Sequence, residues 1–185
     1  CRLVRKTEKK FLIGKIVETE SYPGPYDRAS HAFNFKKTAR NRAEYLEGGH
    51  IYIYLVYGMY WQLNISTGKA GYPECVLIRA LEPLENQKSP PEAPCLPAGR
   101  DPPLAEKIKM QNDNSKFKNV ANGPGKLCRW LKLDTSFYGE DVTKSKRIWI
   151  ETRRERLLKH AIGYGPRIGI DYAGPKWARK PWRFF

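Results

Sequence analysis

Hydrophobic and polar positions alternate in several short stretches of this chain, and the alternation predicts β-strands. Residues 11–22 (FLIGKIVETESY) follow a period of two that places Glu18, Glu20 and Tyr22 on one face. The PGP sequence that comes next ends the strand, because proline restricts the residue before it and glycine favours a turn. We therefore expect residues 23–42 to form a loop that carries several basic residues.

A second alternating stretch, residues 50–66 (HIYIYLVYGMYWQLNIS), is rich in aromatic and β-branched residues and is interrupted at Gly58. This pattern predicts two strands joined by a tight turn. It places Tyr52 and Tyr54 on one face of the first strand and Tyr57 on the other face, close to the turn.

A third stretch, residues 74–81 (ECVLIRAL), has the continuous apolar character of a strand that is buried on both faces. Arg79 interrupts the apolar run. A charge in such a strand needs an anionic partner, so we expect a carboxylate beside Arg79.

The remaining segments predict short elements around this strand-rich centre. Residues 88–103 are rich in proline and form an insertion or loop rather than a domain boundary. Helices are expected at 104–110, 123–133 and 154–162, and strands at 167–174 and 178–185. With 185 residues and 41% hydrophobic content, the chain is expected to form a single domain, 1–185, of the α+β class.

The composition favours a polyanionic partner. The formal net charge is +15, from 34 lysine and arginine residues against 19 aspartate and glutamate residues, which suits nucleic acid or an anionic membrane. The most apolar stretch is about half as long as the roughly 20 residues that span a bilayer, so no membrane is expected. Eleven tyrosines and five tryptophans among the basic residues are typical of proteins that stack on unpaired bases.

Acidic side chains gather in one part of this basic chain: Glu18, Glu20 and Asp27, followed by His31. Carboxylates in a basic groove would repel phosphates, so one that is kept there is expected to do chemistry. It either activates water as a general base or binds a divalent metal for phosphodiester hydrolysis, and the pattern leaves both open. For one of the two glutamates we expect a plain ion pair with lysine or arginine. The four cysteines lack the spacing of zinc ligands and are expected to be reduced structural thiols.

The sequence GPGKLC, residues 123–128, does not match a Walker motif, which needs four residues between its glycines and a Ser or Thr after the lysine. It predicts a glycine turn into a helix. That turn is either structural or a contact for one DNA phosphate, made by free N–H groups and Lys126.

Together these segments resemble the alkyladenine (3-methyladenine) DNA glycosylases. The resemblance covers residues 11–87 and 121–185 and rests on the motifs ETESY, GPYDRASH, TARNR, IYIYLVYGMYWQLNIS, CVLIRALEPLE, GPGKLC and WARKPWRFF. It implies a curved antiparallel sheet surrounded by helices. It also implies that a tyrosine enters the minor groove while a damaged purine nucleotide is flipped into a pocket.

The resemblance assigns roles in binding the flipped base. The wedge tyrosine falls on Tyr57. The implied pocket walls are Tyr22 and His31 on one side of the base and Tyr54 on the other. Asn64 matches the asparagine that crowds the exocyclic 2-amino group of guanine.

The same resemblance implies the catalytic set. Glu20 matches the general base, and Arg79 together with the backbone carbonyl of Ile168 matches the groups that hold the attacking water. Arg40 and Lys126 are further candidates for DNA contacts.

The chain departs from the family pattern in a few places. Ser21 and Ala39 replace an expected alanine and proline, which should matter little. Glu44 falls where the family carries a methionine beside the wedge. We expect its carboxylate to face the minor groove and its phosphates, and to change lesion range or affinity.

The expected function is a monofunctional glycosylase that removes alkylated, etheno or deaminated purines from double-stranded DNA and leaves an abasic site. No lysine is placed as a Schiff-base nucleophile, and no metal or organic cofactor is required. We expect a monomer, nuclear in a eukaryote and otherwise cytoplasmic in the nucleoid. The alternatives are a metal-dependent nuclease built on Glu18, Glu20 and Asp27, and a non-catalytic nucleic-acid-binding domain.

Overall fold

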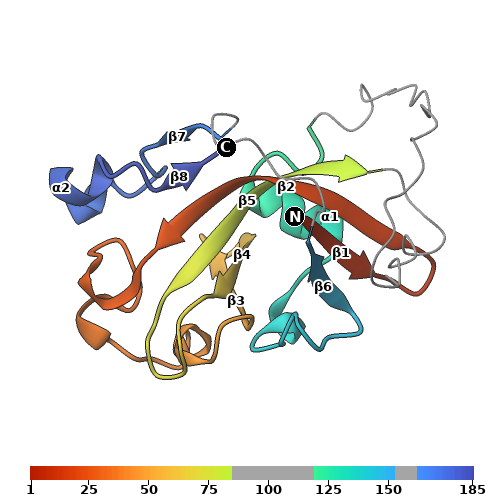
Figure 1. The fold of residues 1–185 in the computed structure, drawn as a ribbon, viewed down its shortest axis with the longest axis horizontal. Helices are drawn as coiled ribbons and strands as arrows, with labels where there is room; N and C mark the ends of the chain where they lie inside the picture. The colour runs from red at the N-terminus through yellow and green to blue at the C-terminus, as the bar shows by residue number, and fades with distance from the viewer. Residues whose placement is uncertain (85–118, 153–161) are drawn as a thin grey trace, which may run out of the picture.

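The computed structural model describes residues 1–84, 119–152 and 162–185 (Figure 1). The proline-rich stretch 88–103 and the helix expected at 104–110 lie outside the described residues, as does nearly all of the helix expected at 154–162. None of the helices in the described parts of the chain is long and apolar enough to cross a membrane.

One curved antiparallel sheet dominates the described structure. Its main path runs β3–β4–β5–β2–β1–β6, and β8 pairs with both β2 and β7. The strands are β1 (Arg2–Lys6), β2 (Phe11–Tyr22), β3 (Ile51–Val56), β4 (Tyr60–Ser66), β5 (Cys75–Leu84), β6 (Ile148–Glu151), β7 (Tyr164–Gly165) and β8 (Arg183–Phe184). Figure 1 shows β2 and β5 arching together across the molecule. The predicted α+β class with a curved antiparallel sheet is therefore confirmed.

A register irregularity in β2 accounts for part of this curvature. The pairing of β2 with β5 shifts between Ile16 and Glu18 and again between Glu18 and Thr19. An extra residue on one strand bends it and increases its local twist. The two halves of β2 also have different neighbours on their other edge: residues 11–15 pair with β1, whereas Thr19 and Glu20 pair with β8.

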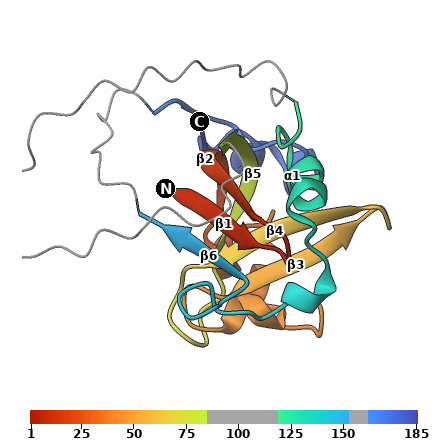
Figure 2. The same cartoon turned by 90° about the vertical axis from the view of Figure 1, so that its right-hand side faces the viewer.

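Helix α1 (Pro124–Leu131) covers the sheet beside β4 (Figure 2). Its buried side chains Leu127, Cys128 and Leu131 join the main hydrophobic core. The approach is close at Gly125, where an added Cβ would lie 3.0 Å from the ring of Tyr60. The GPGK turn therefore has a structural role, because a larger residue at Gly125 would push the helix away from the strand.

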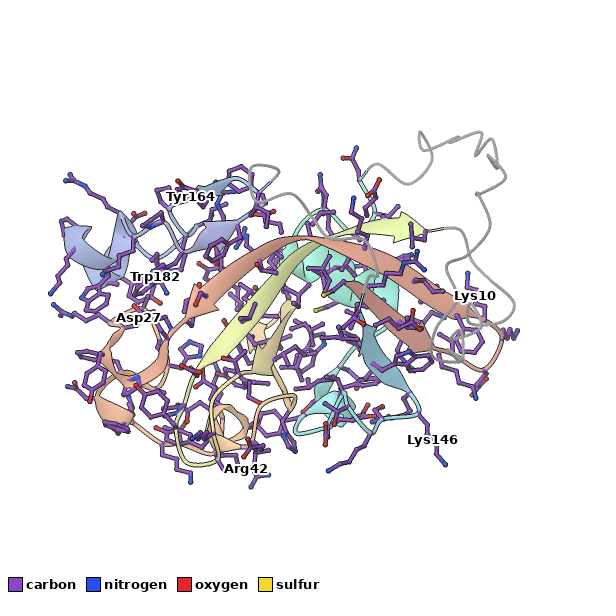
Figure 3. The ribbon with its side chains drawn as sticks, viewed as in Figure 1. Lys10, Asp27, Arg42, Lys146, Tyr164 and Trp182 are labelled. Atoms are coloured by element: carbon purple, nitrogen blue, oxygen red, sulfur yellow. The ribbon has the colours of Figure 1, made fainter. Side chains whose placement is uncertain are left out.

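Short helical turns and the C-terminal segment complete the described fold. The 3₁₀ turns are η1 (Gly24–Tyr26), η2 (Phe33–Phe35), η3 (Arg42–Tyr45), η5 (Thr135–Phe137) and η7 (Asp171–Ala173), and the second α-helix is α2 (Pro175–Ala178). Figure 3 shows Asp27 and Trp182 at one end of the molecule and Lys10, in the turn between β1 and β2, at the other. The C-terminal segment thus lies beside the loop that follows β2.

The strands predicted at 11–22, 50–66 and 74–81 and the helix at 123–133 are confirmed, with small changes in their ends. The strand predicted at 167–174 is wrong: its apolar alternation fits a strand, but Gly169 and Gly174 have φ of 75° and 86°, and the chain turns there. Within 178–185 only β8 is a strand: Ala178 ends α2, and residues 179–182 form a turn and an irregular segment.

Strands β1, β6 and β7 were not predicted, since each has too few residues to reveal a period.

Candidate active site

A pocket of about 420 Å³ opens where β2 to β5 meet the loop after β2 and residues 168–172. The sequence indicates ten candidate residues for catalysis, base binding and DNA contact. Nine of them line the pocket: Glu20, Tyr22, His31, Arg40, Tyr54, Tyr57, Asn64, Arg79 and Ile168. Lys126 does not line this pocket. It lies exposed on α1, where its Nζ contacts Asn122 Oδ1 at 3.3 Å.

Glu20 is the fully buried carboxylate of the pocket, with 0% of its surface exposed. Its Oε1 accepts a hydrogen bond from the backbone N–H of Ile168 at 2.8 Å and faces Arg79 Nη1 at 3.2 Å. Its Oε2 accepts one hydrogen bond, from the Tyr22 hydroxyl at 2.9 Å. The three donors hold the carboxylate in one orientation and compensate for its burial.

Arg79 connects the two glutamates of β2. Its Nε donates to Glu18 Oε1 at 3.0 Å, while its Nη1 faces Glu20. Arg183 of β8 also donates to Glu18, at 3.1 Å. The expected carboxylate beside Arg79 is therefore confirmed, and Glu18 is the glutamate with a plain ion-pairing role.

Asp27 belongs to a different cluster. It is fully buried against Arg167, whose Nη1 and Nη2 both donate to its carboxylate, the second at 2.9 Å. Arg167 also donates to the backbone carbonyl of Ser21 at 3.0 Å and lies over the ring of Tyr22. This ion pair ties the loop after β2 to the residue immediately before Ile168.

The shared metal site that a nuclease would need is not formed by these carboxylates. Glu18 and Glu20 contact Arg79, whereas Asp27 contacts Arg167, so that each already has a cationic partner. No group of three or more His, Cys, Asp or Glu side chains in the described ranges is arranged to hold a metal ion.

Replacing Arg167 with methionine should lower the free energy of unfolding by about 3–5 kcal/mol, because Asp27 would stay buried without its partner. Urea denaturation measures this change. The matched control is Lys15→Met, which breaks the pair between Lys15 and Glu82, whose side chains are 39% and 45% exposed. The control should change stability by no more than about 1 kcal/mol. Equal effects of the two variants would contradict a structural role for Arg167.

Aromatic side chains line one wall of the pocket. Tyr52 and Tyr54 lie on the same face of β3, with ring centroids 5.1 Å apart, as the alternation predicts. The buried Tyr52 hydroxyl lies 2.7 Å from His31 Nδ1. Burial, and to a lesser degree Arg40, lowers the pKa of His31, so its imidazole is neutral at pH 7. A neutral ring can contact a cationic base without repelling it.

The expected placement of His31 and Tyr54 on opposite sides of a base is wrong. The centroids of His31 and Tyr54 lie 4.8 Å apart at an interplanar angle of 68°, so their rings touch edge to face. A flat base between two rings needs about 7 Å, twice the usual contact distance between carbon atoms. The two rings are therefore neighbours on one wall of the pocket, together with Tyr52.

Tyr57 occupies the tip of the hairpin formed by β3 and β4, which Figure 2 shows extending past α1. Its side chain is 86% exposed. Its φ is 52°, a left-handed conformation that is uncommon outside glycine, and Gly58 follows with φ of 68°. The turn therefore holds a large aromatic ring in solvent at the rim of the pocket.

Asn64 and Cys75 lie deeper in the pocket lining, on neighbouring strands. The buried Asn64 donates from Nδ2 to the backbone carbonyl of Tyr52 at 3.1 Å, which fixes its orientation. The Cys75 Sγ lies 3.9 Å from Asn64 Oδ1 and 3.3 Å from Glu44 Oε1. Cys75 is thus a buried thiol between two oxygen acceptors.

The expected position of Glu44 is wrong. The carboxylate does not lie on the surface, where it could face DNA phosphates. The residue is only 2% exposed, because η3 turns its side chain toward Cys75 and the pocket. Burial raises the pKa of Glu44 to about 7, although hydrogen bonds from Cys75 and Asn41 act in the opposite direction.

The raised pKa of Glu44 makes stability depend on pH. The folded protein binds this proton more tightly than the unfolded chain, so the stabilisation is complete below about pH 4.5 and is lost as the pH rises through about 7. Glu44→Gln cannot titrate and should gain stability relative to the unaltered protein between pH 5 and pH 8, by on the order of 3 kcal/mol. Urea unfolding at both pH values tests this, and parallel pH profiles would refute it.

Some residues of the site could not be identified from the sequence. Arg167 is an example, since its partner Asp27 lies far away along the chain. Tyr172 lines the pocket and donates from its hydroxyl to the backbone carbonyl of Ala29 at 3.1 Å. The sequence indicated Tyr52 only through the alternation that places it on the same strand face as Tyr54.

Comparison with known proteins places this arrangement in a family. The chain belongs to the methylpurine-DNA glycosylase family, whose model matches residues 1–185. The expected resemblance is therefore confirmed, and with it the hydrolase class of a DNA-repair glycosylase.

Individual relatives agree with this family. A putative 3-methyladenine DNA glycosylase of Clostridioides difficile is 38% identical over 92% of this chain and 83% of its own length. A putative 3-methyladenine DNA glycosylase of Clostridium novyi is 40% identical over 99% of this chain and 83% of its own length. The human DNA-3-methyladenine glycosylase is 37% identical over 100% of this chain, which spans 57% of the human protein.

Proposed function

We propose that this protein removes alkylated, etheno or deaminated purines from double-stranded DNA by base flipping and hydrolysis, acting as a monomer without a metal or organic cofactor. The observation that carries the proposal is the buried Glu20, held by three donors in a pocket with the exposed Tyr57 at its rim. A base in a duplex hides its glycosidic bond, so a wedge and a pocket are both needed.

Tyr57 enters the minor groove and fills the space that the flipped nucleotide leaves. Extrusion costs a few kcal/mol, and less for a damaged base that pairs poorly, so recognition begins with this cost. Arg40 of the loop after β2 contributes positive charge at the pocket, where its guanidinium lies 4.9 Å from the ring of Tyr54. Lys126, on the helix beside the hairpin, contacts a DNA phosphate.

The flipped base stacks on the aromatic side chains of the pocket, Tyr22, His31 and Tyr54. Stacking on aromatic side chains contributes about 1–3 kcal/mol per base, and a cationic alkylpurine is attracted further by the electron-rich ring faces. Asn64, held in place by Tyr52, excludes normal guanine through its 2-amino group.

Glu20 acts as the general base for water. Its Oε1 already has two donors and its Oε2 has one, so Oε2 is the oxygen best placed to take a proton from water. Arg79 and the backbone carbonyl of Ile168 hold that water. The ionised carboxylate also stabilises the oxocarbenium character that develops on the sugar as the glycosidic bond breaks.

The products are a free base and an abasic site in an intact strand. Cleavage of the strand by a lyase step needs an amine nucleophile that forms a Schiff base with the sugar. Among the described residues that line the pocket there is no lysine.

The deciding experiment measures release of free base from a duplex that carries a single hypoxanthine or ethenoadenine, in the presence of EDTA. We expect release, with strand breaks only after alkali treatment. Glu20→Gln should still bind the lesion duplex, but its excision rate should fall by about 10²–10⁴-fold, as expected for loss of a general base.

Glu82→Gln is the matched control for this experiment. Glu82 pairs with Lys15 on the surface and does not line the pocket, so the variant should keep most of its excision rate. Loss of activity in EDTA would favour the metal-dependent nuclease, and DNA binding without any product would favour the non-catalytic binder. Retained excision by Glu20→Gln would remove Glu20 from the catalytic role.

The wedge role of Tyr57 predicts a separate effect on binding. Tyr57→Ala should weaken affinity for the lesion duplex by about 5- to 100-fold, because one stacked aromatic ring is lost. Fluorescence anisotropy measures this affinity. Tyr164→Ala is the control, since Tyr164 is 68% exposed and does not line the pocket. An equal loss in both variants would show that Tyr57 contributes only general aromatic surface.

A further inference from the structure

Glu44 is a buried acid that the proposed mechanism does not use. It lines the same pocket as Glu20, yet it contacts neither Arg79 nor Arg167 in the described ion pairs. Its Oε1 accepts from Cys75 Sγ, but its Oε2 is buried without a hydrogen-bond partner in the described structure. An ionised carboxylate without a cationic partner is costly in such a place.

The titratable groups around Glu44 come from three directions and keep their protons near neutral pH. Cys75 lies beside it on β5, Tyr52 and Tyr54 on β3, and Tyr45 follows it in the chain. The pKa of each is raised, mainly by burial. Two further groups face this cluster: Arg40 lies over the ring of Tyr54, and His31 Nδ1 lies 2.7 Å from the Tyr52 hydroxyl. Burial lowers the pKa of His31, whereas the pKa of Glu44 is raised to about 7, so Glu44 is the group among these side chains whose charge changes near pH 7.

Glu44 lacks an ion-pair partner, and this suggests what kind of ligand would suit it. Glu20 and Asp27 have arginine partners within the protein, whereas none of the described ion pairs includes Glu44. Arg40 lines the same pocket, but its guanidinium lies over the ring of Tyr54. A positive charge inside the pocket would supply the missing partner. The proposed substrates include purines of two kinds: N-alkylated purine nucleotides such as 3-methyladenine carry a fixed positive charge, and hypoxanthine and ethenoadenine are neutral.

We propose that Glu44 is a charge-selective residue of the pocket, whose carboxylate favours cationic N-alkylated purines over neutral damaged purines. This inference rests on the proposed function, because it concerns which flipped bases the pocket prefers. We do not propose Glu44 as a second general base, because it contacts a different set of residues from Glu20. Glu44 bonds to Cys75, which lies beside Asn64, whereas Glu20 bonds to Ile168 and Arg79.

The sign of the pH dependence follows from the charge states. Below about pH 7 Glu44 is protonated and must release its proton before it can attract a cation. Above that pH the carboxylate is already ionised, so a cationic base gains an attraction, while a neutral base buries an unpaired charge. The preference for the cationic base should therefore rise with pH through about 7.

The test compares two substrates on one enzyme, so that pH effects on the hydrolytic step that both substrates share cancel in the ratio of their rates. Release of 3-methyladenine from a methylated duplex and of hypoxanthine from a duplex with a single lesion is followed at pH 6, 7 and 8. Spontaneous loss of methylated base is subtracted with Glu20→Gln. In the unaltered protein the rate ratio of 3-methyladenine to hypoxanthine should increase by about tenfold between pH 6 and pH 8.

Glu44→Gln keeps the shape of the side chain and removes its charge. In this variant the ratio should be about tenfold lower at pH 8 and should no longer change with pH. Glu82→Gln removes the same charge from the exposed surface of β5 and should leave the ratio as in the unaltered protein. If Glu44→Gln does not fold, the pH dependence of the ratio in the unaltered protein still tests the inference.

Two results would overturn the inference. A ratio that is constant with pH in the unaltered protein, or equal losses of both activities in Glu44→Gln, would leave Glu44 with a structural role only. In either case both bases are still released, so the proposed function stands. Failure of the unaltered protein to release either base would overturn the proposed function and this inference together.

Discussion

The buried ion pair between Asp27 and Arg167 is the interaction on which the candidate active-site pocket depends. Both side chains are 0% exposed, and they join segments from the two ends of the chain. Ile168 follows Arg167, and its backbone N–H reaches Glu20. A buried pair of this kind adds little net stability over apolar packing, but losing one partner is costly. The pair therefore specifies where the C-terminal segment docks, and so completes the donor set of Glu20.

Arginine pairing also explains how acidic groups persist in so basic a protein. Glu18 and Glu20 share Arg79, and Arg183 adds a second contact to Glu18. These contacts neutralise the carboxylates locally, so they do not present a negative field to an approaching phosphate backbone. Glu44 is the exception among these carboxylates, since none of the described ion pairs includes it, and this difference underlies the separate role that we propose for it.

The curvature of the sheet sets the relative positions of Tyr57 and Glu20. The irregular pairing around Glu18 bends β2 over β5, and the change of neighbour from β1 to β8 places Glu20 between two strands. The hairpin of β3 and β4 comes from the other side of β5 and ends in the exposed Tyr57. The same sheet thus places the buried carboxylate of Glu20 and the exposed ring of Tyr57 in the lining of one pocket.

The sequence by itself determined the long strands, the turn at Gly58 and the shared faces of Glu18 with Glu20 and of Tyr52 with Tyr54, because these depend on periods of two or on local turn chemistry. The resemblance to a family supplied the pocket residues, nine of which the structure brings together.

Only the tertiary structure decided the partner of Asp27, the burial of Glu44, the turning of 167–174 and the edge-to-face contact of His31 with Tyr54. These features arise from residues distant in sequence and from backbone angles at single glycines, which no local pattern encodes.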